Sequence, residues 1–205
     1  MCSQADARIC SQAGDGIGDE DMDVKDAIEK RRAYRSLDPV EITDDMVKDL
    51  AHAASLSASC FNKQPWRYVF VYGPEALKEL KTALNKGNEW AHFASMIIAV
   101  FTKNEDDCIV KNREYALFDT GMATATLILR ATEIGLVAHP IAGYDEQRAK
   151  AILNVPAEST LITLINVGKK RKELRPEMSD GQKQGEATRP ERLEFGKFAY
   201  VDRVG

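Results

Sequence analysis

The sequence predicts an α+β layer fold, and three observations lead to this class. Apolar and β-branched segments predict strands at residues 67–73, 95–102 and 160–168, and segments with helical periodicity separate them. Helices outnumber the strands, which disfavours a many-stranded doubly wound sheet. No G-x-G-x-x-G motif follows a strand and no Walker loop is present. The sequence therefore gives no support to a classical dinucleotide fold or a P-loop fold.

Composition limits the class of protein further. The chain has 205 residues, a length typical of one domain with appendages. Its 28 Lys and Arg residues stand against 32 Asp and Glu residues, and the net charge of −4 disfavours a nucleic-acid partner. No apolar run approaches the ~18 residues of a membrane span. The first ten residues lack the pattern of a secretory signal. We expect a soluble, cytoplasmic protein without a membrane partner.

The cysteine pattern argues against a metal centre. The four cysteines are widely spaced and none belongs to a C-x-x-C pair: Cys2, Cys10, Cys60 and Cys108. With only three histidines in the chain, the ligand spacings of structural zinc sites are absent. We therefore predict no metal site and expect free thiols in a reducing compartment.

Two regions differ from the rest in composition. Residues 1–23 form an acidic leader that contains one arginine and six acidic residues, for a net charge of +1 − 6 = −5. We expect it to be flexible; the alternative is an arm that docks on a partner subunit. The remaining domain, 24–205, ends in a polar extended tail from residue 169. A late apolar cluster in this tail predicts packing on something distant, such as a partner chain: Phe195, Phe198, Tyr200 and Val201.

The first predicted helix runs over residues 24–34. Asp23 is a suitable N-cap, and helical spacing places three residues on the buried side: Ala27, Ile28 and Tyr34. Pro39 disfavours helix at the residue before it and so separates this helix from the next.

Two more helices and a loop surround the first strand. Thr43 caps a predicted helix over residues 44–56, and 57–65 is a polar loop rich in turn residues. After the strand at 67–73, Pro74 suits the first turn of a helix that extends to residue 84.

The second half of the chain contains the longest predicted helix, over residues 115–134, which Gly135 ends. This helix is apolar nearly all round, so we expect it to be buried within the fold or at a subunit interface. A short strand and loop follow over 136–145, and a short helix over 145–153.

Four local features together favour a site for a phosphorylated aromatic cofactor. In the first, residues 31–36, four positions separate Arg31 from Arg35, so the two guanidinium groups share one face of the predicted helix and can bind phosphate. The alternative is a basic helix C-terminus that complements the helix dipole.

The other three features lie further along the chain. The loop 57–66 offers hydroxyls and the Asn62 amide, which suits the donor and acceptor edge of a flavin; the alternative is an ordinary loop. The turn 139–145 could direct backbone N–H groups at a ring nitrogen; the alternative is a simple strand-ending turn. Arg189 and Arg192 form a late basic pair, with a solvated charged face as the alternative.

Three motifs in this order resemble the FMN-dependent nitroreductase family. They are K-R-R-A-Y-R-S, S-A-S-C-F-N-K-Q-P-W-R-Y-V-F-V and G-L-V-A-H-P-I-A-G-Y-D, and the resemblance covers residues 24–168, with a looser match through 201. It implies an α+β fold with a small mixed or antiparallel sheet flanked by helices. It also implies an intertwined homodimer with FMN at the interface, contacted by both chains.

The resemblance implies a role for each motif. Arg31 and Arg32 would bind the FMN phosphate or ribityl chain with Ala33 alongside, and Arg35 would approach the N1/O2 edge, where a cation favours the anionic reduced flavin. One of Arg189 and Arg192 would complete the phosphate site. The partner chain would supply a second set: Ala58, Ser59, Cys60 and Asn62. Backbone groups of one turn would face the flavin N5 region: Pro140, Ile141, Ala142 and Gly143.

Some positions depart from the family pattern. Serine is common where this chain has Ala33, and a proline–serine–serine turn is common at residues 58–60. Cys60 is therefore predicted near the flavin, and we favour its interpretation as a small buried thiol that packs. His139 lies near the proposed site, but as a lone histidine it is interpreted as structural. The register around residues 87–90, where the family often adds a flavin contact, is not fixed by the sequence.

The implied activity is that of an FMN-dependent NAD(P)H oxidoreductase. NADH or NADPH would deliver hydride to FMN N5 and leave, and a small-molecule acceptor such as a nitroaromatic or a quinone would then be reduced, with ping-pong kinetics. The flavin carries the chemistry, so no catalytic side chain is predicted. Alternatives on the same scaffold are reductive dehalogenation, enone reduction and flavin fragmentation. Others are a flavin-binding redox sensor with little turnover, and a protein without a cofactor that uses its long helix to dimerise.

Overall fold

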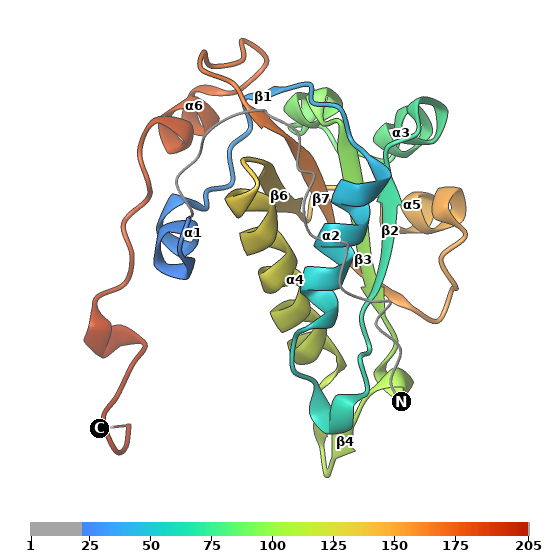
Figure 1. The fold of residues 1–205 in the computed structure, drawn as a ribbon, viewed down its shortest axis with the longest axis vertical. Coiled ribbons are helices and arrows are strands. Elements are labelled where there is room, and N and C mark those ends of the chain that lie inside the picture. Colours follow the sequence, from blue (N-terminus) through green and yellow to red (C-terminus); the bar gives the residue numbers. More distant parts are fainter. Residues whose placement is uncertain (1–21, 205) are drawn as a thin grey trace, which may run out of the picture.

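An antiparallel sheet with helices on both faces forms the centre of the protein (Figure 1). The computed structural model describes residues 22–204, so the predicted flexible leader lies almost entirely outside the described residues. The predicted α+β class is confirmed. All the strand pairings are antiparallel, so of the two sheet types expected the structure has the antiparallel one.

The longest strand, β7, organises the main sheet. It pairs with β3 on one side, where Ile98 lies opposite Ile165, and with β6, where His139 lies opposite Asn166. Strand β2 extends the sheet beyond β3, and β1 pairs with the C-terminal end of β7. The strands of this sheet are β1 (Leu37–Asp38), β2 (Arg67–Val71), β3 (Met96–Thr102), β6 (Val137–Ile141) and β7 (Thr160–Lys170). A separate small hairpin pairs β4 (Ile109–Val110) with β5 (Arg113–Glu114).

Helices cover the two faces of the sheet and create two cores. Successive side chains of β3 point to opposite faces of the sheet and so belong to different cores: Ile97 and Ala99 lie in one, and Ile98 lies in the other. One core lies beneath α3 and α5, and the other beneath α2 and α4. The α-helices are α1 (Val24–Lys30), α2 (Asp44–Ser55), α3 (Pro74–Lys81), α4 (Ala116–Glu133), α5 (Glu146–Leu153) and α6 (Asp180–Ala187).

Three of the predicted helix boundaries are confirmed. The Asp23 side chain accepts from the Asp26 N–H at the start of α1, and the Thr43 hydroxyl accepts from the Met46 N–H at the start of α2. Gly135 follows α4 with φ +76, a left-handed conformation that favours glycine. One face of α4 is buried within the fold, whereas Leu117 and Phe118 at its start are exposed in this chain, so their burial at a subunit interface stays a prediction.

The prediction of a helix over residues 24–34 is wrong beyond Lys30. The backbone leaves helical geometry at Arg31, where ψ is 118, and Tyr34 is not helical. The Ile28 side chain is 54% exposed, so it does not belong to the buried side. If α1 continued, Arg31, Arg32 and Arg35 would lie close together on the helix and repel one another. The backbone N–H groups of Arg35 and Ser36 instead donate to the Glu186 carboxylate, which is distant in sequence. Arg31 and Arg35 therefore do not share a helical face.

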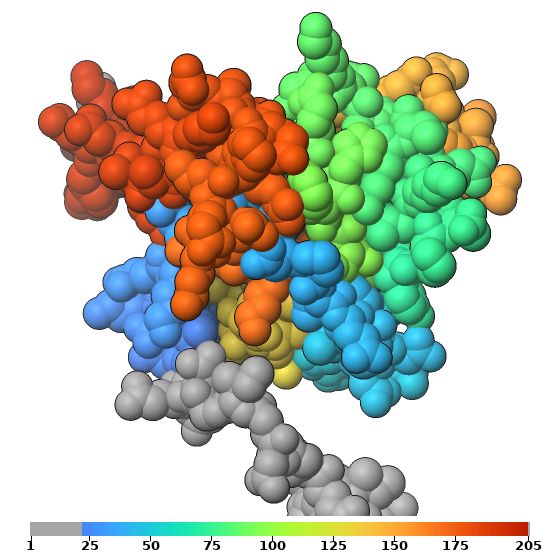
Figure 2. All heavy atoms as spheres, turned by 90° about the horizontal axis from the view of Figure 1, so that it is seen from above, coloured from blue at the N-terminus to red at the C-terminus, as the bar shows by residue number. Residues whose placement is uncertain are grey.

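The C-terminal segment contains a helix, α6, that its polar sequence did not predict. Ser179 and Gln182 form a reciprocal capping box at its start, a pattern that is visible in the sequence. Figure 2 shows this segment, in orange and red, packed beside the N-terminal residues 24–40. The apolar cluster of the tail, including Phe195 and Phe198, is exposed in this chain, and its packing on a partner stays a prediction.

Among the helices of residues 22–204, none combines the length and the apolar character that crossing a bilayer requires.

Candidate functional site

A pocket of about 520 Å³ gathers the arginines of both ends of the chain. Its walls come from the segment after α1, from α6 and from the residues that follow α6. The lining residues are Arg31, Arg32, Ala33, Arg35, Ser179, Gly181, Gln182, Gly185, Arg189, Pro190 and Arg192. The structure thus brings together the first and fourth predicted features, although more than 150 residues separate them in the sequence. The helical geometry proposed for Arg31 and Arg35 is replaced by an irregular segment that lines the same pocket.

The carboxylate of Glu186 fixes the backbone of this segment. Glu186 is buried, and its two oxygens accept from the backbone N–H groups of Arg35 at 2.7 Å and Ser36 at 2.8 Å. The Arg32 guanidinium donates to the carbonyls of Gly185 and Glu186, each at 3.0 Å, at the C-terminal end of α6. A cation there complements the helix dipole. These bonds hold the 31–36 segment against α6 and thereby shape the pocket.

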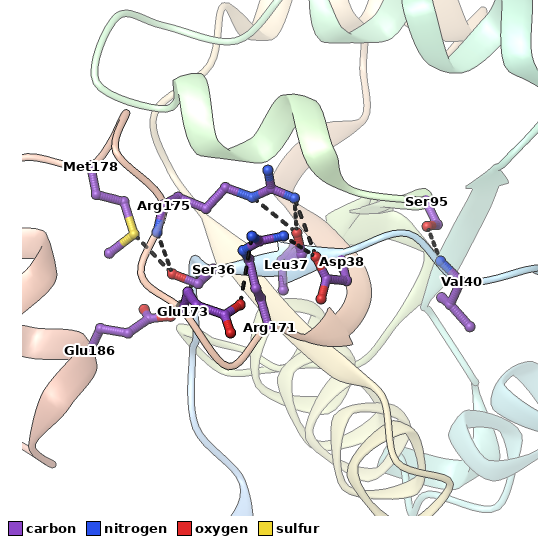
Figure 3. Close-up of polar contacts among 10 residues, drawn as sticks. All are labelled: Ser36, Leu37, Asp38, Val40, Ser95, Arg171, Glu173, Arg175, Met178 and Glu186. Atoms are coloured by element: carbon purple, nitrogen blue, oxygen red, sulfur yellow. Dashed lines mark hydrogen bonds and ion pairs between the residues drawn. The ribbon is translucent and has the colours of Figure 1, made fainter.

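A second set of contacts anchors β1 to the residues after β7 (Figure 3). Arg175 donates through Nε to the Leu37 carbonyl at 3.1 Å, and its backbone N–H donates to Ser36 Oγ at 3.1 Å. Arg171 pairs with the Asp38 carboxylate at 2.8 Å. The C-terminal segment therefore returns to the N-terminal part of the domain as a fixed element rather than as a loose extension.

The pocket is strongly electropositive. Burial and the neighbouring cations Arg189, Arg192 and Arg32 all lower the pKa of Arg31. Arg189 lies beside the C-terminal end of α1, where its guanidinium donates to the carbonyls of Glu29 and Arg31. Like charges at this density repel one another, and an anion in the pocket would relieve that repulsion. Guanidinium groups arranged in this way suit a phosphate group.

Trp90 links this pocket to the sheet and was not assigned by the sequence. It belongs to the 3-10 helix η2 (Glu89–Phe93), and its ring stacks on His139 with 4.6 Å between the ring centroids. The Arg35 guanidinium lies over the ring of Trp90, 5.8 Å from its centroid. The sequence did not fix the register around residues 87–90, so this contact of Trp90 could not be predicted from it.

His139 is buried and contacts a backbone carbonyl, which favours the structural interpretation made from the sequence. Its Nδ1 lies 3.0 Å from the Tyr34 carbonyl oxygen, and burial lowers its pKa to about 4. The imidazole is therefore neutral near pH 7 and is not a source of protons there.

The turn after β6 joins the arginine pocket through residues 87 and 88. Gln182, a pocket residue, donates to the Gly87 carbonyl at 2.9 Å, and the Asn88 side chain donates to the Gly143 carbonyl at 2.8 Å. Pro140 and Ala142 are exposed at this turn, whereas the Ile141 side chain packs in the core. The structure therefore brings the third predicted feature next to the first and the fourth.

The loop with Ala58, Ser59, Cys60 and Asn62 lies elsewhere. In Figure 1 it lies near the hairpin of β4, at the opposite end of the molecule from α6. Phe61, the residue between two predicted contacts, is 87% exposed. A single chain therefore does not assemble the second predicted feature with the other three.

The expectation of free thiols is wrong for two of the four cysteines. Cys60 and Cys108 form a disulfide, with their Cα atoms 6.0 Å apart, so Cys60 is not the packed thiol that we favoured. The loop of Cys60, with its 3-10 helix η1 (Cys60–Asn62), packs against the 3-10 helix η3 (Asn104–Asp106) region, and this contact joins residues 48 positions apart. Cys2 and Cys10 lie outside the described residues.

Comparisons with known proteins agree with this architecture. The model of the nitroreductase family matches residues 28–94 and 85–169. Protein DrgA of Synechocystis is 23% identical over 215 residues, covering 89% of this chain and 98% of that protein. An NADH dehydrogenase of Thermus thermophilus is 24% identical over 178 residues, covering 72% of this chain and 86% of that protein.

Solved structures share the fold over most of the chain. The crystal structure of an oxidoreductase containing FMN superposes with a TM-score of 0.77 at 21% identity, covering 95% of this chain and 96% of that chain. A nitroreductase family protein from Clostridium novyi NT gives a TM-score of 0.68 at 24% identity, covering 74% of this chain and 87% of that chain. Since the family model spans most of the domain that holds the sheet and the arginine segment, this chain belongs to the nitroreductase family.

Proposed function

We propose that this protein is an FMN-dependent NAD(P)H oxidoreductase whose acceptors are nitroaromatics, quinones or similar small molecules. The observation that carries the proposal is the pocket in which five arginines from both ends of the domain converge. Two relatives support it: one of the matched structures contains FMN, and the Thermus thermophilus relative is named for its use of NADH.

The pocket residues fit the phosphate end of FMN. Arg32 and Arg189 already donate to backbone carbonyls and so build the walls. We therefore assign the phosphate to Arg31 and Arg192, and this assignment favours Arg192 over Arg189, between which the sequence left the choice open. Arg35, held over Trp90, would approach the ring system of the cofactor. Bound FMN would supply the redox chemistry, in which electrons pass from the nicotinamide to the acceptor.

The residues of this chain would bind and orient the cofactor rather than react. Arg31 and Arg192 offset the phosphate charge, and the turn at Ala142 and Gly143 offers backbone groups at the other end of the site. A fixed cation such as Arg35 near the ring stabilises negative charge that develops on reduction. His139, neutral near pH 7, fixes the strand below the site.

We also propose that the working form is a homodimer. The 58–62 loop of one chain is too far from its own arginine pocket to contact the same cofactor, so a second chain would supply it. The exposed aromatic residues of the tail, Phe195 and Phe198, offer apolar surface for such an interface.

The spectrum of the purified protein tests the proposal. We expect flavin absorption that bleaches when NADH or NADPH is added without oxygen and that recovers when a nitroaromatic or a quinone is added. Initial rates at several concentrations of donor and acceptor should give parallel double-reciprocal lines, because the two substrates occupy one face in turn. Flavin that resists both donors would instead favour a flavin-binding sensor. A protein that takes up no added FMN would contradict the assignment of the pocket.

A panel of acceptors separates the reductase from its alternatives on the same scaffold. Nitroaromatics and quinones should reoxidise the reduced protein faster than halogenated phenols or enones do. The reverse order would replace the proposed substrate class by reductive dehalogenation or enone reduction.

A further inference from the structure

The disulfide between Cys60 and Cys108 ties together two segments that the sheet does not connect. Cys60 belongs to the 57–65 loop, and Cys108 lies between η3 and the β4–β5 hairpin. Both cysteines are half-buried, so the disulfide does not lie in the closed core. In Figure 1 these segments meet beyond the end of α4, far from α6.

Two buried carboxylates accept hydrogen bonds from the backbone of the two disulfide cysteines. Asp119, 2% exposed on α4, accepts from the backbone N–H of Cys60 at 2.6 Å. Asp107, 8% exposed, accepts from the backbone N–H of Cys108 at 2.7 Å. A carboxylate oxygen of Asp107 and the two sulfur atoms all lie within 4.8 Å of one another. Each acid therefore orients one cysteine, and one acid reaches both sulfurs.

The environment of Asp107 suits a group that exchanges protons. Burial raises the pKa of Asp107, and the neighbouring Asp119 carboxylate raises it further; the Cys108 N–H and the charge of Lys63 act in the opposite direction. Within residues 22–204, nothing donates to Asp107 Oδ2, which is fully buried. A raised pKa increases the fraction of molecules in which this carboxyl is protonated, and in those molecules it can give its proton to the thiolate that leaves when the neighbouring S–S bond is broken.

We propose that Cys60 and Cys108 form a redox-active thiol site that exchanges with dithiols, with Asp107 as its proton donor and acceptor. A thiolate of the external dithiol attacks one cysteine sulfur, the S–S bond breaks, and the displaced thiolate takes a proton from Asp107. Asp107 then takes the proton of the second thiol of the reagent, whose sulfur displaces the protein sulfur and releases a cyclic disulfide. The displaced protein thiolate takes from water the proton that the first thiol of the reagent gave up. The reagent loses two electrons and two protons, and the protein gains two thiols, with Asp107 protonated again.

Reduction would release a loop that is held in an unfavourable conformation. Phe61, Asn62 and Gln64 all have positive φ values, between 48 and 56, which non-glycine residues rarely adopt. The disulfide is a covalent restraint on this loop, and Ser59 Oγ adds a hydrogen bond from the Gln64 N–H. Since we propose that this loop contacts FMN in the partner's site, the thiol state would set how firmly the cofactor is held; this step rests on the proposed function.

The thiol chemistry is tested first, without reference to the cofactor. In the full chain carrying C2S and C10S, alkylation and intact mass should show no free thiol after oxidation and two after equilibration with excess dithiothreitol. The Asp107→Asn variant, which keeps the acceptor for the Cys108 N–H, should react several-fold more slowly, and Glu105→Gln, an exposed acid three residues from Cys108, should not. Two free thiols under oxidising conditions, or equal rates in the two variants, would overturn the proposal.

Loop release is measured by proteolysis. Trypsin should cut after Lys63, Lys111 or Arg113, all exposed near the disulfide, faster in the reduced protein than in the oxidised protein. Cys108→Ser should be cut at the fast rate with or without dithiothreitol, and an unchanged circular dichroism spectrum would show that it folds. Equal cutting of the reduced and oxidised forms would overturn the proposed release.

FMN binding then separates the two proposals. The dissociation constant should rise about tenfold on reduction, because a loop that must be ordered on binding costs affinity, and Cys108→Ser should match the reduced protein. If FMN does not bind in either state while the thiol titration succeeds, the proposed function fails and the thiol site stands. If FMN binds equally in both states, the coupling between thiol state and cofactor is wrong.

Discussion

The buried carboxylate of Glu186 accepts a 2.7 Å hydrogen bond from the backbone N–H of Arg35, across 151 residues of sequence. Its other oxygen binds the next N–H, that of Ser36. Removing one partner leaves buried donors unsatisfied. Glu186→Ala should therefore lower the free energy of unfolding by about 2–4 kcal/mol, summed over two charge-assisted bonds.

Chemical denaturation monitored by circular dichroism measures this loss. Glu177→Ala, at an exposed position of the same segment, is the matched control and should change the free energy by less than about 0.5 kcal/mol. Equal effects of the two substitutions would mean that Glu186 does not hold the arginine segment.

Arg31→Ala should weaken FMN binding by about 10- to 100-fold, the scale of one or two lost charge-assisted hydrogen bonds. Quenching of FMN fluorescence on titration measures the dissociation constant. Arg148→Ala removes an equal charge from the exposed face of α5 and should leave the constant nearly unchanged. An unaltered constant in Arg31→Ala would remove the phosphate from this pocket.

His139 should make the protein less stable in mild acid. Its pKa falls from an ordinary 6.5 to about 4 because the ring is buried, so the unfolded chain binds more protons than the native state between these values. Stability from the neutral ring is complete above about pH 6.5 and is lost as the pH falls toward 4, by about 2–3 kcal/mol at pH 4.5.

The His139→Gln variant isolates this contribution. Between pH 7.5 and 4.5, the free energy of unfolding of the variant should fall by about 2–3 kcal/mol less than that of the wild type. His52→Gln, on the exposed side of α2, should follow the wild-type profile. Parallel profiles for His139→Gln and the wild type would show that this histidine does not titrate abnormally.

Gly143→Ala should disturb the turn that meets the proposed ring site. A Cβ built there would clash with Asn88 Nδ2, so the Asn88 side chain must leave the Gly143 carbonyl that it binds. We expect a loss of about 1–3 kcal/mol in stability, the usual result of forced repacking. The double variant Gly143→Ala, Asn88→Ala should be less damaged than the sum of the single variants, as a double-mutant cycle would reveal.

Strong local patterns predicted most of the fold. The apolar β3 and β7 and the long α4 with its glycine stop all lie within a few residues of their predicted bounds. These elements can be predicted from their own residues, because the apolar side chains whose spacing predicts each element are the ones that it buries in the core. The short strand β1 carries no such pattern and exists because β7 is long enough to pair with it.

Long-range contacts account for what the sequence did not reveal. Helix α1 ends at Lys30, and beyond it the backbone N–H of Arg35 binds the Glu186 carboxylate of α6 instead of a helical carbonyl. No local sequence pattern marks this change of hydrogen-bond partner. The pairing of Cys60 with Cys108 likewise depends on two loops that meet only in the fold. The capping box of Ser179 and Gln182 is the one signal that could have located α6.

The arrangement of the arginine pocket has a consequence for how the protein is made. A ribosome delivers Arg31 among the first residues of the domain and Arg192 only after β7 and α6 have emerged. The nascent chain can thus form its sheet while half of the pocket is still missing. Loading of an anionic ligand would then be among the last events of biogenesis and would close the N-terminal segment onto a finished scaffold.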